Sequence, residues 1–227
     1  MTAYLSPAET EALLLSLRVA AVAALAALPF AIAAAILLAR GNFPGKIVLD
    51  GIIHIPLVLP PVAMGFLLLT IFGTRAGIGG WLYRAFGVQF VFHWTGAALA
   101  AAIITFPFQV RAIRIALQGA DPGLEDAAET LGAGRLDRLF NLTLPLALPG
   151  VVAGLITAFA AGLGEFGAII TFVSNIPGET RTLPLAIYTA LQTPGGETEA
   201  AKLSLISIAL ALVFMTLAEW LQRRLRR

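Results

Sequence analysis

Residues 124–138, LEDAAETLGAGRLDR, hold six of the 28 charged residues (15 Lys and Arg, 13 Asp and Glu) in a chain of 227 residues. The rest of the sequence is strongly apolar, with 59% hydrophobic residues, 12% charged residues and a mean hydropathy of +0.89. A soluble domain carries about 25% charged residues. The composition is therefore that of an integral membrane protein, in which a patterned charged segment is expected at the membrane surface.

Apolar runs on both sides of this segment are long enough to cross a membrane core of about 30 Å, which takes about 20 helical residues. Five such runs lie at about residues 13–39, 47–72, 94–117, 146–173 and 203–221. A weaker run at residues 183–191 is too short and is expected at the interface or as a re-entrant piece. β-Barrel strands would instead alternate in segments of about 10 residues. We predict an all-α, polytopic transmembrane helical bundle in one domain, residues 1–227, with five spans and six as the alternative.

Lysine and arginine are unevenly shared between the two sides of these five spans. The side that holds residues 124–138 and the C-terminal RRLRR carries ten of them, whereas the other side carries four. The positive-inside rule places the richer side in the cytoplasm. The N-terminus is thus predicted to be periplasmic and the C-terminus cytoplasmic. Arg18 lies near the outer end of the first span, where its long side chain can reach the headgroups.

The charged segment has the signals of two short helices. Asp121 followed by Pro122 is typical of a helix start. An apolar stripe at helical spacing follows, formed by Leu124, Ala127, Ala128 and Leu131. The residues Gly132-Ala133-Gly134 end this helix, and the same spacing restarts beyond them with Arg135 and Arg138 exposed. The prediction is a sharp elbow between two amphipathic helices, and the pattern by itself leaves open whether the elbow is solvated or docks a partner.

Glu165 is the one carboxylate well inside an apolar run, in the sequence GLGEFG at residues 162–167. The glycine spacing formally matches a dinucleotide fingerprint, but that motif needs a strand before it and a helix after it, so we reject it. An acid in the membrane costs on the order of 3 kcal/mol and normally faces protein or water. Two interpretations stay open: a hydrogen-bonded glutamate at a helix contact, or a gate. Gly164, Glu165 and Gly167 are the gate or pathway candidates.

Several other patterns bear on function. The chain has no cysteine, its two histidines show no zinc-site spacing, and it lacks a phosphate-binding loop. We therefore predict no catalytic residue, no metal and no cofactor in this chain. Prolines at positions 56, 60, 61 and 107 lie inside two of the runs, either as kinks around a pathway or as packing kinks. Gly154 and Gly162 share one face of the fourth run and indicate a close helix contact. The outer segment at residues 173–202 is either a partner surface or a solvated loop.

The charged segment resembles the cytoplasmic loop of ABC importer permeases. The pattern of that loop is Glu-Ala-Ala, three residues, Gly, nine residues, an aliphatic residue, one residue and Leu-Pro. Here it reads Asp126-Ala127-Ala128, Gly132 and Leu142-Thr143-Leu144-Pro145, with Asp126 in place of the glutamate. The resemblance implies a type I ABC importer permease fold, in which residues of about 119–145 couple the chain to an ATPase subunit. The implied coupling residues are Asp126, Ala127, Ala128, Gly132, Leu144 and Pro145.

Nearly the whole chain resembles the molybdate ABC transporter permeases. The resemblance rests on FPGK, IPLVLPPVAMGFLLL, LGAGRLDRLFNLTLPLALPG, GLGEFGAIITFVSNIPGETRTLPLAIYT and QTPGGE. It implies a non-enzymatic permease of the bacterial inner membrane that forms a homodimer, contacts lipid and binds no nucleic acid. It also implies two ATP-binding subunits, which bind ATP and Mg²⁺, and a periplasmic molybdate-binding protein. The alternatives are a sulfate or tungstate permease and, less favoured, a membrane enzyme or a secondary transporter.

Overall fold

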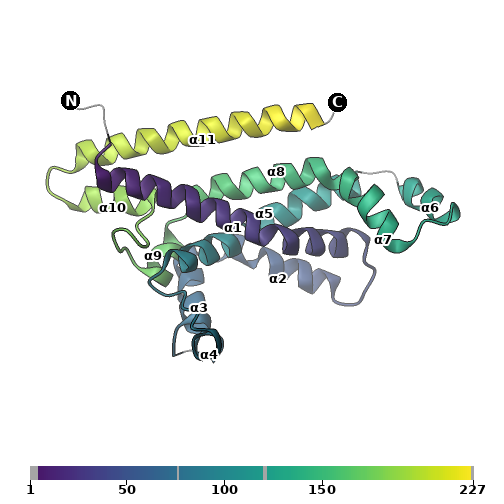
Figure 1. Ribbon diagram of the computed structural model, residues 1–227, viewed down its shortest axis with the longest axis horizontal. Helices are drawn as coiled ribbons and strands as arrows, with labels where there is room; N and C mark the ends of the chain where they lie inside the picture. The colour runs from purple at the N-terminus through teal and green to yellow at the C-terminus, as the bar shows by residue number, and fades with distance from the viewer. Residues whose placement is uncertain (1–4, 76, 120–121, 226–227) are drawn as a thin grey trace.

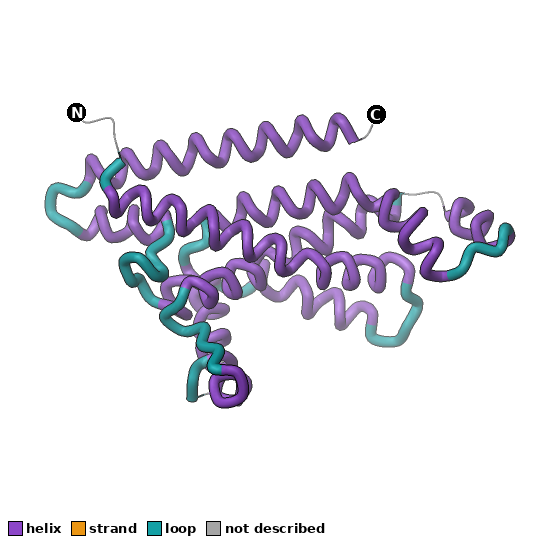
Figure 2. Tube along the Cα trace, in the orientation of Figure 1, coloured by secondary structure: helices purple, strands orange, loops and turns teal. Residues whose placement is uncertain are grey.

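The computed structural model describes residues 5–75, 77–119 and 122–225. Every regular element in these ranges is a helix (Figure 2), which confirms the predicted fold class. In chain order the helices are α1 (Pro7–Arg40), α2 (Lys46–Val58), α3 (Pro61–Phe72), α4 (Gly77–Phe86), α5 (Trp94–Gln118), α6 (Pro122–Thr130), α7 (Arg135–Arg138), the π-helix η1 (Leu139–Thr143), α8 (Leu144–Leu163), α9 (Gly167–Val173), α10 (Leu183–Gln192) and α11 (Glu197–Leu225).

Four continuous helical stretches in the described part of the chain are long and apolar enough to cross a membrane. They are α1, α5, Leu136–Leu163 and Glu197–Leu221. Helices α2 and α3 pass the same test only as a pair, and they are bent by 115° at the break between them. With this pair counted as one broken span the total is five, and without it the total is four. Helix α10 has 10 residues and is too short to span, as predicted.

The ends of the bundle carry different elements (Figure 1). One end holds α6, α7 and the end of α11, and we name it the α6 end. The other holds the start of α1 together with α9 and α10, and we name it the α10 end. The start of α1 and the end of α11 therefore lie at opposite ends of the bundle, as an odd number of spans requires.

Of the four prolines named above, only the tandem pair Pro60 and Pro61 breaks a helix. Pro60 and Pro61 separate α2 from α3, whereas Pro56 and Pro107 lie inside continuous helices. A single proline removes one backbone hydrogen bond, while two successive prolines remove two neighbouring ones at the same turn. Leu59 then leaves the helix with extended backbone angles. The tandem prolines are thus the bend between α2 and α3, and both expectations for Pro56 and Pro107, a kink around a pathway and a packing kink, stay open.

The fourth predicted span is displaced along the chain. The run at residues 146–173 is not one helix, because α8 ends at Leu163 and α9 begins only at Gly167. At its other end the helix begins earlier than predicted, since α7, η1 and α8 follow one another without a gap from Arg135. The π-helical turn directly precedes Pro145, whose missing N–H and bulky ring disfavour regular α-helical bonding at this point. The second arm of the elbow is therefore the first turn of a long helix.

Small residues build the core of the bundle. Helix α1 packs on α5 and α8 through fully buried alanines, and α8 approaches α5 through glycines. A Cβ atom at Gly154 would lie 3.0 Å from the Cα of Gln109, so the two backbones touch there. Gln109 also donates a hydrogen bond of 2.9 Å from Nε2 to the carbonyl oxygen of Ala24. Close small-residue contacts with an interhelical polar bond are typical of membrane bundles, and the predicted contact at Gly154 is confirmed.

Candidate functional site

The elbow between α6 and α7 projects from the α6 end of the bundle (Figure 1). Helix α6 starts at Pro122, and its predicted cap Asp121 lies outside the described residues. Its end is closed by backbone bonds from Gly132 N–H to the Glu129 oxygen and from Ala133 N–H to the Ala128 oxygen, both 3.0 Å. Gly132 has φ of +86°, a left-handed conformation that residues with a Cβ rarely adopt. The elbow therefore forms where the sequence predicts it.

An ion pair joins the two arms of the elbow. Arg138 of α7 donates from Nη1 to Oε2 of Glu129 on α6. The prediction that Arg138 is exposed was wrong, because its side chain retains only 19% of its accessibility while Glu129 retains 66%. An exposed pair of this kind contributes about 0–1 kcal/mol to stability. Its main consequence is geometric, since it limits the angle between the arms.

Large apolar side chains cover the outside of the elbow. Leu131 is 88% exposed and Leu136 is 71% exposed, and Leu124 and Phe140 are exposed as well. The predicted apolar stripe of α6 is thus not buried against the rest of this chain. Exposed large apolar side chains gathered on one projecting element are typical of a protein interface. We name these four residues the elbow patch.

The predicted coupling residues divide into two groups. Ala127, Ala128 and Gly132 lie on the elbow beside the elbow patch, with Ala127 and Gly132 exposed. Asp126 belongs to α6, but the placement of its side chain is outside the described part of the structure. Leu144 and Pro145 lie at the start of α8, after the π-helical turn. They do not lie on the elbow itself.

The second predicted group surrounds the break between α8 and α9. Glu165 is 8% exposed, and its Oε1 accepts a hydrogen bond of 2.8 Å from the N–H of Ala168. The carboxylate therefore caps the start of α9, which is the hydrogen-bonded interpretation of this residue. Gly164 ends α8 and is exposed, whereas Gly167 is buried. The two glycines have different roles although they lie three residues apart.

The break between α8 and α9 packs on the break between α2 and α3. A Cβ atom at Gly167 would lie 2.8 Å from the Cβ of Pro61. A Cβ atom at Gly65 would lie 2.7 Å from both the carbonyl oxygen of Ala168 and the Cβ of Thr171. Sequence reasoning singled out Gly167 but missed its partners, for which the tandem prolines were the available signal. We name this contact between the two broken spans the double break.

The segment between α9 and α10 is tied to α1, although Pro177, Gly178 and Glu179 within it are exposed. Thr180 is fully buried and bonds the backbone of Ser174 and Ile176 through its hydroxyl. The N–H of Leu183 donates 2.6 Å to the Ser16 hydroxyl of α1. Defined hydrogen bonds therefore hold this segment to the bundle, and both expectations for it, a partner surface and a solvated loop, stay open.

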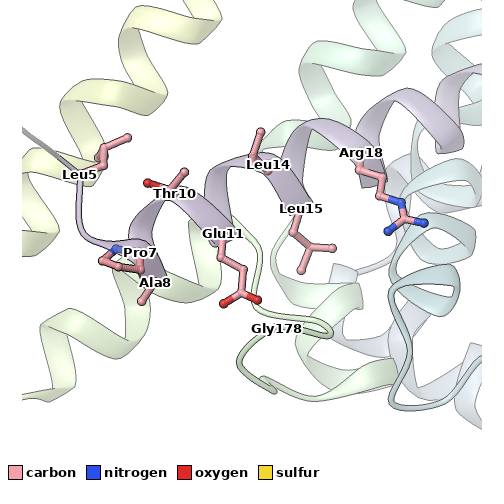
Figure 3. A pocket seen from close by; sticks show the side chains of 9 residues that line it. All are labelled: Leu5, Pro7, Ala8, Thr10, Glu11, Leu14, Leu15, Arg18 and Gly178. Atoms are coloured by element: carbon pink, nitrogen blue, oxygen red, sulfur yellow. The ribbon is translucent and has the colours of Figure 1, made fainter.

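A cavity of about 810 Å³ opens along α1 at this end (Figure 3). The Glu11 side chain points toward the loop that holds Gly178, and Arg18 lies further along the helix. The Arg18 guanidinium stands 3.7 Å from the ring centroid of Trp94, so an aromatic face holds its charge. The cavity at the α10 end is therefore lined by an acidic side chain, Glu11, and a basic one, Arg18.

Comparison with known proteins assigns the chain to a protein family. Residues 27–227 match the family described as binding-protein-dependent transport system inner membrane component. The chain belongs to this family. As a member it is a multi-pass permease of the inner membrane, and ATP hydrolysis lies on a separate subunit of the transport system.

Individual relatives agree with this membership. The chain is 58% identical over 219 residues to the molybdenum transport system permease protein ModB of Escherichia coli K12, covering 96% of each chain. It is 35% identical over 198 residues to the sulfate transport system permease protein CysT of the same organism, covering 87% of this chain and 71% of that protein. Its fold matches a chain of a bacterial ABC transporter that imports the acidic polysaccharide alginate, with a TM-score of 0.77 at 20% identity, covering 98% of this chain and 82% of that one.

Proposed function

We propose that this chain is the permease subunit of an ATP-driven molybdate importer. The similarity to a molybdenum permease reaches 58% identity over 96% of the chain, against 35% identity to a sulfate permease. We propose molybdate as the transported anion on the basis of this difference. The geometric observation that carries the transport mechanism is the elbow patch, which presents apolar surface to a partner at the α6 end. A sulfate or tungstate permease is the alternative.

We infer that two copies of the chain assemble with two ATP-binding subunits at the α6 end and a periplasmic molybdate-binding protein at the α10 end. The excess of lysine and arginine toward the α6 end supports a cytoplasmic position for it and for the C-terminus. The N-terminus is then periplasmic. ATP and Mg²⁺ bind to the partner subunits, and this chain carries no cofactor.

Motion reaches the membrane through one continuous element. When ATP closes the two ATPase subunits, the elbows seated on them are drawn together. Residues Leu136–Leu163 form an uninterrupted helical path of 28 residues, which is about 42 Å long at 1.5 Å per residue. This helix ends at the double break, so displacement of the elbow is delivered to the place where two spans are interrupted. ATP shifts the equilibrium because the partner binds it more tightly in one of the two states.

The substrate assignment is tested with the complete complex in liposomes, including the binding protein. We expect molybdate to stimulate ATP hydrolysis and to accumulate inside the vesicles, with tungstate as a close competitor. Binding protein without anion is the control for basal hydrolysis. Stimulation by sulfate alone would overturn the molybdate assignment and would favour the sulfate alternative.

A further inference from the structure

Helices α2 and α5 border an open polar cavity of about 580 Å³ that is separate from both sites described above. Its polar lining comes from Asp50 and His54 of α2 and from Arg111, Arg114 and Gln118 of α5. These residues recur at helical spacing, so each set lies on one face of its helix. The cavity is therefore bounded by two polar helix faces in an otherwise apolar bundle.

Positive charge exceeds negative charge in this cavity. Arg114 donates from Nη1 to Oδ2 of Asp50 at 2.9 Å, which neutralises one guanidinium. The ring Nδ1 of His54 lies 2.8 Å from the carbonyl oxygen of Asp50 and 3.3 Å from its Oδ1, which is buried without a hydrogen-bond partner. Among the described residues, none forms a hydrogen bond or ion pair with Arg111, whose side chain is exposed. One unneutralised guanidinium thus faces the cavity.

Burial of the opposite face of α5 keeps Arg111 and Arg114 on the face that lines the cavity. Val110, Ile113 and Leu117 are fully or almost fully buried in the core next to α1. Rotation of α5 would expose these side chains and bury charge, which is costly without a partner. The direction in which Arg111 and Arg114 point is therefore a fixed property of the fold.

The cavity lies between the double break and the α6 end. Asp50 and His54 are about 6 and 12 Å along α2 from its start at Lys46, and Arg111 is about 10 Å from the end of α5 at Gln118. The far end of α2 is the proline break on which Gly167 packs. Non-helical backbone within membrane spans is tolerated where it lines a cavity or is buried in protein. Helix α2 thus connects the interrupted spans with the basic cavity.

We propose that Arg111 and Arg114 form a low-affinity exit site for the transported tetrahedral oxyanion, a step that rests on the proposed function as an oxyanion importer. Guanidinium groups bind such anions through paired N–H donors. A conducting site must also release its ion. Asp50 supplies that property, because it competes with the anion for Arg114 and restores the ion pair when the anion leaves.

The absence of cysteine from the chain permits a site-specific test. Ile115 is exposed, lines the cavity and lies one turn from Arg111. The variant Ile115→Cys is assembled with cysteine-free partner subunits, and its reaction with negatively and positively charged thiol reagents is timed. We expect the negative reagent to react faster and millimolar molybdate to slow it. Arg111→Gln should lower the negative-to-positive rate ratio about tenfold, the scale of focusing in a charged cleft, and Arg111→Lys should restore most of it.

Two controls separate the exit site from a general effect of removing positive charge and from a lipid headgroup site. Arg224→Gln removes an arginine that stands over Trp220 on α11, away from this cavity, and should leave the rate ratio unchanged. An unchanged ratio in Arg111→Gln would overturn the exit site. Protection by phosphatidylglycerol vesicles but not by molybdate would also overturn it, in favour of the lipid headgroup site. If the wild-type complex imports sulfate and not molybdate, and sulfate protects the cysteine, the proposed substrate fails while the exit site is supported.

Discussion

Replacing Gly167 by alanine is expected to push apart the two broken spans of the double break. The new Cβ would lie 2.8 Å from the Cβ of Pro61 and 3.3 Å from the amide nitrogen of Val62. Carbon atoms pack best at about 3.5–4.0 Å, so the contact is short by about 0.7–1.2 Å. Overpacking of this kind costs about 1–3 kcal/mol. If the double break opens during transport, this cost destabilises the packed state and shifts the equilibrium between the packed and the open state by about 5- to 150-fold.

The assay is ATP-driven molybdate uptake by the reconstituted complex, measured together with ATP hydrolysis and thermal unfolding in detergent. Gly164→Ala is the matched control, because its Cβ would meet only the Ala161 oxygen at an ordinary 3.7 Å. We expect uptake per ATP to fall several-fold in Gly167→Ala and to stay near the wild-type value in the control. Gly65→Ala, which meets the Ala168 oxygen at 2.7 Å, should behave like Gly167→Ala. Equal uptake and equal stability in both Gly167→Ala and its control would refute the role of the double break.

Three further variants test the elbow and the bundle. Gly132→Val should raise the energy of the elbow by about 1–2 kcal/mol because φ there is +86°, and it should uncouple ATP hydrolysis from uptake without affecting insertion. Gly134→Val is the comparison, because a side chain there also meets open space but the residue has no positive φ. Unchanged uptake in Gly132→Val would count against the coupling role. Lys202→Met should destabilise the protein by about 1.5–3 kcal/mol, since it removes the 2.7 Å charged hydrogen bond to the buried Glu9 carboxylate, which keeps the N–H of Ser6 as a partner. The double variant with Glu9→Gln should recover much of the lost unfolding temperature, and no recovery would argue against the ion pair. Gly150→Val should lower the unfolding temperature in detergent more than Gly134→Val does, because its Cβ would lie 2.6 Å from that of Ala116; equal temperatures would show that α8 can move away from α5.

Features set by neighbouring residues could be predicted from the sequence. The turn at Gly132 and the short length of α10 follow from local composition and glycine signals. The break after Leu163 was missed because Gly164 and Glu165 lie in an apolar run that reads as one span, and a hydropathy pattern does not show that Glu165 caps a new helix at Ala168. The partial burial of Arg138 was missed for a similar reason. Its partner Glu129 lies on the other arm of the elbow, and the sequence does not show the angle between the arms that brings the two side chains together.

Contacts between distant segments required the tertiary structure. Asp50 and Arg114 are 64 positions apart and form their ion pair only because α2 lies beside α5. Likewise, nothing in the neighbourhood of Gly167 indicates Pro61 as the residue on which it packs. The basic cavity and the double break both depend on which helices are neighbours, and that choice is made by packing of small residues over the whole bundle.

The sequence by itself determined that the chain is a set of membrane helices with a charged elbow at one surface. In lipid, each span must satisfy its backbone hydrogen bonds within itself, so apolar length and local breakers are sufficient to predict a helix. The tertiary structure decided which interruptions meet and which charges share a cavity. These depend on close approach of backbones between distant segments, where one methyl group at a glycine changes the outcome, and no local pattern contains that distance.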